Sequence, residues 1–330
     1  MSALLKLSLK RGALVTAANW QVVLVQFVAD TLFKTLVAVP IVGGLVLVAL
    51  VVGGNPIELL RLDDLAHTVS TMIGVLLAQP VALAAFASAL GIILAGGSIL
   101  MFAVKAGSVT VLLAGDRAAG PIEVPPLQLS ALREANQASL ELFTNGVRSL
   151  FPRYLRLGIG LTVVYAVIAG TYFVFLFGPS ISQALDNPLS VTLASLLLLI
   201  VLTLVNFLYL LLQIVMAAED CGVLEALPLV AKLLRRRTKH LTQVLAAILA
   251  LMLMATGASI LATTALGLIA FVPFVGLAAL PLQVFAWLVR GVVFQFVGLT
   301  GVSTYLRMHF ALQTSSVEVR SPSDGLVTRA

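Results

Sequence analysis

The sequence predicts an all-α membrane protein, a helical bundle that crosses a bilayer about six times. Five long stretches, 35–57, 65–104, 157–185, 187–218 and 240–289, contain no charged residue. A bilayer core about 30 Å thick is crossed by about 20 apolar residues in a helix, so each stretch is long enough to span it. Only 10% of the residues are charged, against about 25% in typical soluble domains. With a mean hydropathy of +1.11, most of the protein surface is expected to face lipid.

The number of spans follows from the length and polarity of these stretches. Residues 65–79 are too polar and too few to cross alone, so 65–104 holds one span. The longest stretch would extend about 75 Å as a single helix, and 271–276, with Pro273, is the expected turn. A single membrane domain, 1–310, then contains spans at about 33–52, 80–104, 157–178, 190–216, 243–268 and 277–302. The polar residues 311–330 are expected to form a disordered cytoplasmic tail.

The distribution of basic residues predicts the orientation of these spans. With the N-terminus inside, the expected outer loops contain one basic residue, Arg61, whereas 17 of the 20 Lys and Arg residues fall on the inner side. This asymmetry is the positive-inside pattern and places both termini in the cytoplasm. The same charges explain the net charge of +6, and their place at the edges of apolar stretches excludes a nucleic-acid partner.

Three basic amphipathic segments, 4–16, 137–156 and 222–241, each precede a pair of spans. The last of them carries a basic patch of five residues, Lys232, Arg235, Arg236, Arg237 and Lys239. The pattern indicates a threefold repeat of helix plus hairpin, or convergence, because positive-inside pressure alone also places basic residues there. Such helices lie along the inner leaflet among anionic phospholipids, or pack beneath the bundle as a cytoplasmic collar.

Three short stretches carry a resemblance to a known family. The stretch 218–227 (Ala-Glu-Asp-Cys-Gly-Val-Leu-Glu-Ala-Leu), the basic stretch 233–239 and the stretch 303–307 (Ser-Thr-Tyr-Leu-Arg) resemble a family of bacterial six-span proteins. That family includes the membrane domain often fused to glycerophosphodiester phosphodiesterases. The resemblance implies a six-span architecture in the bacterial inner membrane. It implies no catalysis, since the chain contains no phosphodiesterase domain, and Pro228 departs from the family pattern.

Arg290 is the main candidate for a ligand-binding residue, because a charge near the middle of a span costs roughly 2.5–3.5 kcal/mol on insertion scales. Gln283 and Trp287 share its helical face, and a second polar stripe on span four contains Asn206, Tyr209 and Gln213. These stripes line a cavity in which Arg290 meets an anionic group, or else Arg290 bonds to a neighbouring helix. Asp30 and Lys34, four residues apart, are expected to pair at the inner interface.

No catalytic, metal or nucleotide motif is present in the sequence. Gly-x-x-x-x-Gly-Lys, His-Glu-x-x-His and Gly-x-Ser-x-Gly are all missing, and the single cysteine, Cys221, excludes an intrachain disulfide. We therefore expect no enzymatic activity and no cofactor. The sequence favours a scaffold, assembly factor or accessory subunit that binds anionic inner-leaflet phospholipids and a membrane-protein partner or a second copy of itself. The alternative is a transporter or lipid-translocating protein with an anion site at Arg290.

Overall fold

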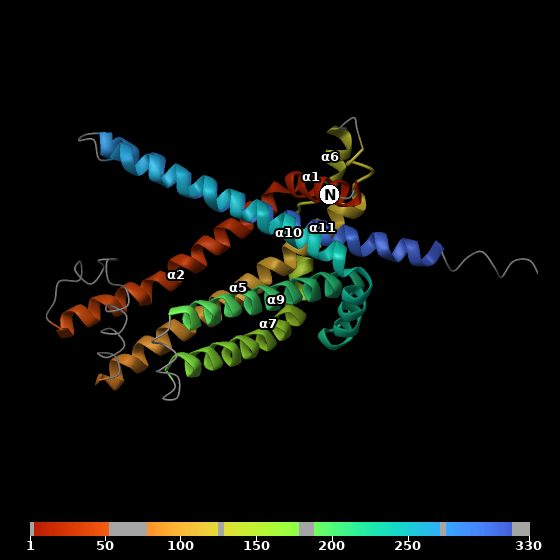
Figure 1. The fold of residues 1–330 in the computed structure, drawn as a ribbon. Coiled ribbons are helices and arrows are strands. Elements are labelled where there is room, and N and C mark those ends of the chain that lie inside the picture. Colours follow the sequence, from red (N-terminus) through yellow and green to blue (C-terminus); the bar gives the residue numbers. More distant parts are fainter. Residues whose placement is uncertain (1–2, 53–77, 125–128, 178–187, 271–274, 319–330) are drawn as a thin grey trace, which may run out of the picture. The chain divides into compact units, whose positions relative to one another are not determined.

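The computed structural model describes residues 3–52, 78–124, 129–177, 188–270 and 275–318, in which the regular elements are all helices. The helices are α1 (Ala3–Ala18), α2 (Trp20–Val52), α5 (Pro80–Ala118), α6 (Leu129–Ala135), α7 (Leu140–Phe177), α9 (Pro188–Glu219), α10 (Val223–Ala270) and α11 (Val275–Glu318) (Figure 1). The chain divides into two compact units, Val25–Val104 and the remainder, and each is described by itself.

Six of the described helices are long and apolar enough to cross a membrane, which confirms the fold class expected from the sequence. Their apolar stretches are Trp20–Gly44, Leu83–Ala118, Leu140–Tyr172, Thr192–Glu219, Thr238–Leu268 and Pro281–Phe310. Each contains part or all of one span predicted from the sequence. The last helix differs from expectation, because α11 continues to Glu318 through the beginning of the predicted tail. No Gly or Pro interrupts 311–318, so nothing there ends the helix; 319–330 lie outside the described residues.

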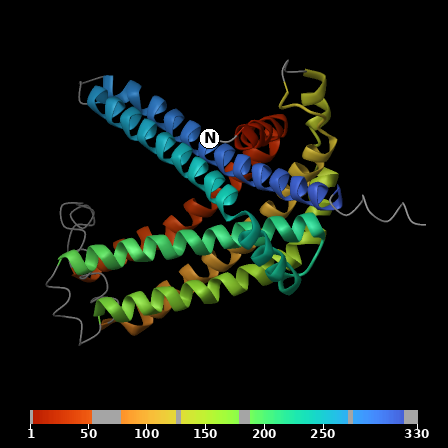
Figure 2. The ribbon, with the colours of Figure 1, turned by 45° about the vertical axis from the view of Figure 1, so that its right-hand side comes forward.

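Two of the three amphipathic segments are continuous with the span that follows them. Residues 140–156 begin α7, and 223–241 begin α10, so one unbroken helix includes both segment and span. Pro152 and Pro228 lie inside these helices. The first part of α10 bends away from the rest of the helix (Figures 1 and 2). The third segment, α1, is instead a separate helix, which ends one residue before α2.

The motif at 218–227 forms the corner between α9 and α10. Asp220 has a positive φ of 51°, a left-handed conformation that ends α9 and that Asp tolerates better than most residues. Its carboxylate accepts a hydrogen bond from Arg153 of α7. The Gly222 N–H donates to the Glu225 carboxylate at 2.9 Å, which satisfies an unpaired donor at the start of α10. Asp220, Gly222 and Glu225 are therefore helix-capping residues in this chain.

Hydrogen bonds from tyrosine hydroxyls join α7 to α9, which lie side by side and antiparallel (Figures 1 and 2). Going along α7, the Tyr154 hydroxyl donates to the Gln213 carbonyl at 2.9 Å, and the Tyr165 hydroxyl donates to the Asn206 amide oxygen at 2.6 Å. The Tyr172 hydroxyl then lies 2.9 Å from the Ser195 hydroxyl. Hydrogen bonds of this kind hold helices together in lipid, where apolar burial supplies no driving force.

The buried side chains of the larger unit gather at one end of its long helices, in a region that we call the collar. The collar consists of α1, residues 105–124, α6, and residues 150–157, 209–217, 226–244 and 299–310. Within it α1 packs against α11, and Thr16 and Ser303 hydroxyls lie 3.3 Å apart. A Cβ on Gly12 would lie 2.4 Å from the Thr304 hydroxyl oxygen and 2.9 Å from the Thr300 carbonyl oxygen. Glycine therefore permits the close approach of α1 to α11.

Asn19 fixes the corner between α1 and α2 from a fully buried position. Its amide nitrogen donates to the carbonyl oxygens of Val15 and Ala135, both at 2.9 Å. Its amide oxygen accepts from the Gln137 N–H at 3.0 Å. One side chain thus joins the first helix to the end of α6 and to the segment between α6 and α7.

The smaller unit, Val25–Val104, contains most of α2 and the first part of α5. The ring of Phe33 lies against Gly97, where a Cβ would come within 2.0 Å of a ring carbon. Lys34 and Asp30 form the expected ion pair, with 2.6 Å between the ammonium nitrogen and a carboxylate oxygen. Both residues belong to the apolar stretch Trp20–Gly44, so pairing lowers the cost of placing two charges near lipid.

Candidate functional site

The most highly connected charged residue of the collar is Arg11, which is 4% exposed. Its Nε donates to Asp116 Oδ1 at 2.6 Å, and its Nη2 donates to the carbonyl oxygens of Asp116 at 2.8 Å and Ala119 at 2.9 Å. Its Nη1 donates to the Gly120 carbonyl oxygen and to Glu123 Oε2, both at 2.8 Å. A guanidinium has five N–H donors, so every donor of Arg11 has an acceptor.

These contacts form because α5 ends at this point. The Gly120-Pro121 pair follows the last turn of α5, as glycine and proline often do at helix ends, and leaves carbonyl oxygens without intrahelical donors. A cation is favourable there because it faces the negative end of the helix dipole. Arg11 reaches these carbonyls from α1, so one side chain both caps α5 and binds the N-terminal helix to it.

The charges of this cluster stabilise one another. Burial alone would lower the pKa of Arg11, but hydrogen bonds to Asp116 and Glu123 and their charges raise it above its ordinary value. Burial alone would raise the pKa of Glu123, but a backbone hydrogen bond and the Arg11 guanidinium lower it below its usual range. Arg307 lowers it further, with Nη2 at 3.8 Å from Glu123 Oε1. Both groups are therefore held in the charged form around neutral pH.

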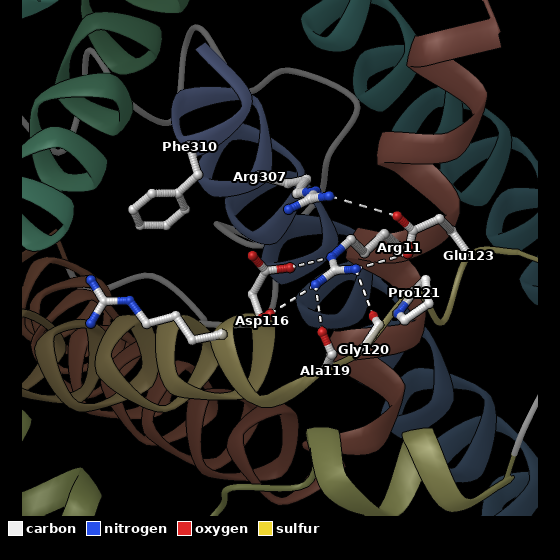
Figure 3. Close-up of a pocket in the computed structure, with 9 residues that line it drawn as sticks. Arg11, Asp116, Ala119, Gly120, Pro121, Glu123, Arg307 and Phe310 are labelled. Atoms are coloured by element: carbon white, nitrogen blue, oxygen red, sulfur yellow. Dashed lines mark hydrogen bonds and ion pairs between the residues drawn. The ribbon is translucent and has the colours of Figure 1, made fainter. Parts of the chain in front are cut away.

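A pocket of about 390 Å³ opens beside this cluster, as Figure 3 shows. Its walls come from the end of α5, the turn that follows it, α1 and the end of α11: Arg11, Asp116, Arg117, Ala119, Gly120, Pro121, Glu123, Arg307 and Phe310. The Arg117 guanidinium stacks on the Phe310 ring at 5.5 Å. The site is thus a polar recess with three arginines, two carboxylates and one aromatic wall.

The sequence-predicted residues on α11 lie elsewhere. Arg290 is exposed, with its guanidinium 5.6 Å from the centre of the Phe294 ring. It lines a recess of about 250 Å³ between α10 and α11 whose other walls are mostly small side chains, among them Ala255, Ser259 and Ala262. Gln283 and Trp287 precede it on α11, and neither lines this recess.

The predicted stripe on α9 contributes to helix packing. Asn206 bonds to Tyr165, and the Gln213 carbonyl accepts from Tyr154. Tyr209 and Gln213 are 8% and 4% exposed, and the Lys105 ammonium lies 5.3 Å from the centre of the Tyr209 ring. The structure does not bring the two stripes around one described pocket; each borders a different pair of helices.

The basic patch lies on the first part of α10. Lys232, Arg235 and Lys239 are exposed there, whereas the side chains of Arg236 and Arg237 lie outside the described residues. Exposed basic side chains on a helix that leads into an apolar span suit the headgroup region of a membrane.

The Arg11 cluster was not predicted from the sequence. Arg11 and Asp116 are 105 residues apart, and no local pattern links them. The sequence signal for this site was the Gly120-Pro121 pair, which indicates the end of a helix. The last carbonyl oxygens of such a helix need hydrogen-bond donors from elsewhere. Among the described residues, no group of three or more His, Cys, Asp or Glu side chains could hold a metal ion.

The fold and these sites define the class of the chain, which is a multi-pass α-helical integral membrane protein. Within that class, neither a protein family, a curated protein nor a solved structure matches the chain.

Proposed function

We propose that the chain is a non-enzymatic membrane protein that acts as a scaffold, assembly factor or accessory subunit in envelope or lipid organisation. The observation that carries this proposal is the uncovered surface of its spans. In the most apolar 18-residue stretch of α10, and in that of α11, only 6% of the residues are buried within the chain. Side chains such as Leu253 and Leu261, 72% and 73% exposed, are available to lipid or to the helices of another protein.

The collar supports the same proposal, because it orders these helices at one end without covering them. A buried cluster around Arg11 and a close helix contact at Gly12 hold the ends together. Such a molecule offers apolar helix faces in a defined arrangement. We expect the partner to be a membrane protein or a second copy of the chain, together with anionic phospholipids of the inner leaflet.

Extraction of the chain with its surrounding native lipids, followed by mass spectrometry of every bound lipid and protein, tests this role. A stoichiometric protein partner or a stable homo-oligomer, with no solute flux in reconstituted vesicles, is the expected result. A chain that purifies as a monomer without a specific partner or lipid contradicts the proposal.

A second function is favoured by one observation, the recess beside Arg290. An exposed arginine in an apolar stretch, next to small side chains on α10, suits an anionic group carried by a transported lipid. Comparison of wild type with Arg290→Leu separates the two roles. Loss of a specific anionic lipid and of lipid flux in Arg290→Leu would favour translocation, whereas unchanged lipids with a bound partner would favour the scaffold.

The proposed location is the bacterial inner membrane with both termini in the cytoplasm, in keeping with the family resemblance and the basic residues of the collar. Cys221, the single cysteine, lies at the α9–α10 corner and is partly buried. An impermeant maleimide should label it in inverted vesicles but not in intact cells. Burial raises the pKa of its thiol, so labelling should accelerate with rising pH. Equally fast labelling in intact cells would reverse the proposed orientation.

A further inference from the structure

Two arginines of the collar pocket have donors that are not used in the Arg11 cluster. Arg11 itself is saturated, and it engages both carboxylates, Asp116 at 2.6 Å and Glu123 at 2.8 Å. The 3.8 Å between Arg307 and Glu123 is longer than a hydrogen bond. Within the described part of the chain, the contact found for Arg117 is the Phe310 ring. The guanidinium groups of Arg117 and Arg307 are therefore able to bind an additional anion.

The formal charge of the pocket also favours an anion. Three arginines face two carboxylates, which leaves one positive charge in excess. Lys10 adds a second nearby, since its ammonium donates to the Glu123 carbonyl oxygen at 2.9 Å. Arg11 with its two carboxylates carries a net charge of −1, so the positive excess of the pocket comes from Arg117 and Arg307.

The chemistry and size of the pocket indicate which anion it would accept. Guanidinium groups bind phosphate oxygens through paired N–H donors, which gives both charge and geometric match. A volume of about 390 Å³ holds a phosphate with a substituent, and Phe310 offers an apolar wall for that substituent. Arg117 and Arg307 lie near the C-terminal ends of the apolar stretches Leu83–Ala118 and Pro281–Phe310.

We propose that this pocket, the recess beside the Arg11 cluster, binds a phosphate group through Arg117 and Arg307, with Phe310 as its apolar wall. The phosphate belongs to a phospholipid headgroup or to a soluble phosphate compound. The site is distinct from Arg290 and from the exposed basic patch of α10. The scaffold role and this site are tested separately, since a partner protein is found by co-purification and phosphate binding is measured on the purified chain.

The test uses the full chain in nanodiscs and compares wild type with Arg117→Gln, Arg307→Gln and the double variant. One arm measures binding of inorganic phosphate by calorimetry in phosphatidylcholine nanodiscs. The other arm measures retention of phosphatidylglycerol over phosphatidylcholine by native mass spectrometry. Arg148→Gln, which removes an exposed arginine of α7, is the matched control.

In at least one arm, each single variant should weaken binding roughly tenfold, the effect of losing a charge-assisted hydrogen bond. The control should bind as wild type. Binding in the phosphate arm alone identifies a soluble ligand, and selective retention in the lipid arm alone identifies a headgroup. Arg117 is exposed, so Arg117→Gln should fold and melt as wild type does, which keeps the result interpretable. Absence of binding in both arms, or equal binding by the double variant, overturns the proposal.

Discussion

The collar and the membrane-crossing halves of α7, α9, α10 and α11 are built from the same apolar residues but are packed differently. In the collar, Val15 and Leu306 are fully buried. Along the spans, Leu253 and Val167 are 72% and 64% exposed. The two regions also treat arginine differently, since Arg11 is buried with five acceptors whereas Arg290 is exposed on one aromatic ring.

The collar determines most of the structural specificity of the chain. Lipid tails solvate leucine as well as a neighbouring helix does, so helix contacts in a bilayer depend on close packing and interhelical hydrogen bonds. The collar provides many such contacts, including the bond from Tyr154 to the Gln213 carbonyl, and the described parts of the spans provide few, chiefly the bonds of Tyr165 and Tyr172 between α7 and α9. We therefore expect substitutions in the collar to destabilise the fold more than comparable substitutions in the spans.

The largest effect is expected for Arg11→Met. Removal of one partner of a buried ion pair leaves an uncompensated charge and lowers the free energy of unfolding by about 3–5 kcal/mol. In this variant the uncompensated charges are those of Asp116 and Glu123, and the carbonyls at the end of α5 also lose their donor. Thermal unfolding in nanodiscs measures the loss. Lys6→Met, which removes an exposed charge from the same helix, is the control and should change little. Equal melting temperatures of the two variants would show that the Arg11 cluster does not stabilise the collar.

A smaller effect is expected for Gly12→Ala. The added methyl group meets the Thr304 hydroxyl and the Thr300 backbone at less than contact distance, and overpacking of this kind costs about 1–3 kcal/mol. Gly257→Ala, on the membrane part of α10 with nothing within 4 Å of the new Cβ, is the matched control. Chemical denaturation should separate the two variants. If Gly257→Ala is the more harmful, the spans are packed more tightly than the structure indicates.

Two tyrosine hydroxyls allow the buried collar and the exposed spans to be compared through single hydrogen bonds. Tyr154 is fully buried, so Tyr154→Phe should cost about 0.5–1.5 kcal/mol, the net value of an intramolecular hydrogen bond. The Tyr165 hydroxyl bonds to the exposed Asn206. Tyr165→Phe should therefore lower the free energy of unfolding by about 0.6 kcal/mol, the average value for hydrogen bonds between membrane helices. Unfolding of both variants under one condition tests the order, and the reverse order would count against it.

The smallest effect is expected from acid. The pKa of Glu123 is lowered in the folded chain. Its contribution to the stability of the fold is therefore present above the ordinary pKa of about 4.3 and is lost as the pH falls below that value. Hydrogen exchange of 116–123 should therefore increase on acidification from pH 6 towards pH 3. The Glu123→Gln variant should show a smaller increase over the same interval. An identical pH dependence in the two proteins would assign the change to other carboxylates.

The sequence predicted six long apolar helices because hydropathy is a local property of 20 or so residues. It also predicted the pair of Lys34 with Asp30, which are four residues apart in one helix. It did not predict the Arg11 cluster, whose members are brought together only by tertiary structure. For Arg290, helical periodicity identified which residues share a face, but not whether another helix covers that face; the structure leaves Arg290 exposed.

For the polar stripe on α9, the sequence also identified residues on one helical face but not the residues that contact them. Asn206, Tyr209 and Gln213 do share a face, as their spacing predicted. The partner of Asn206 on α7 could not be read from the sequence, because the pairing of Tyr165 with Asn206 depends on the register between two helices. The periodicity therefore located a contact surface, and only the structure identified it as helix packing.

The contact between Thr16 and Ser303 joins residues separated by 287 positions, so it forms late during biosynthesis. At about 5–20 residues per second, the ribosome adds Ser303 roughly 15 to 60 s after Thr16. During that interval the first helix has left the ribosome without its final binding surface, and its positive charges favour a temporary place on the membrane surface. The collar closes as one of the last steps of assembly, when α11 arrives.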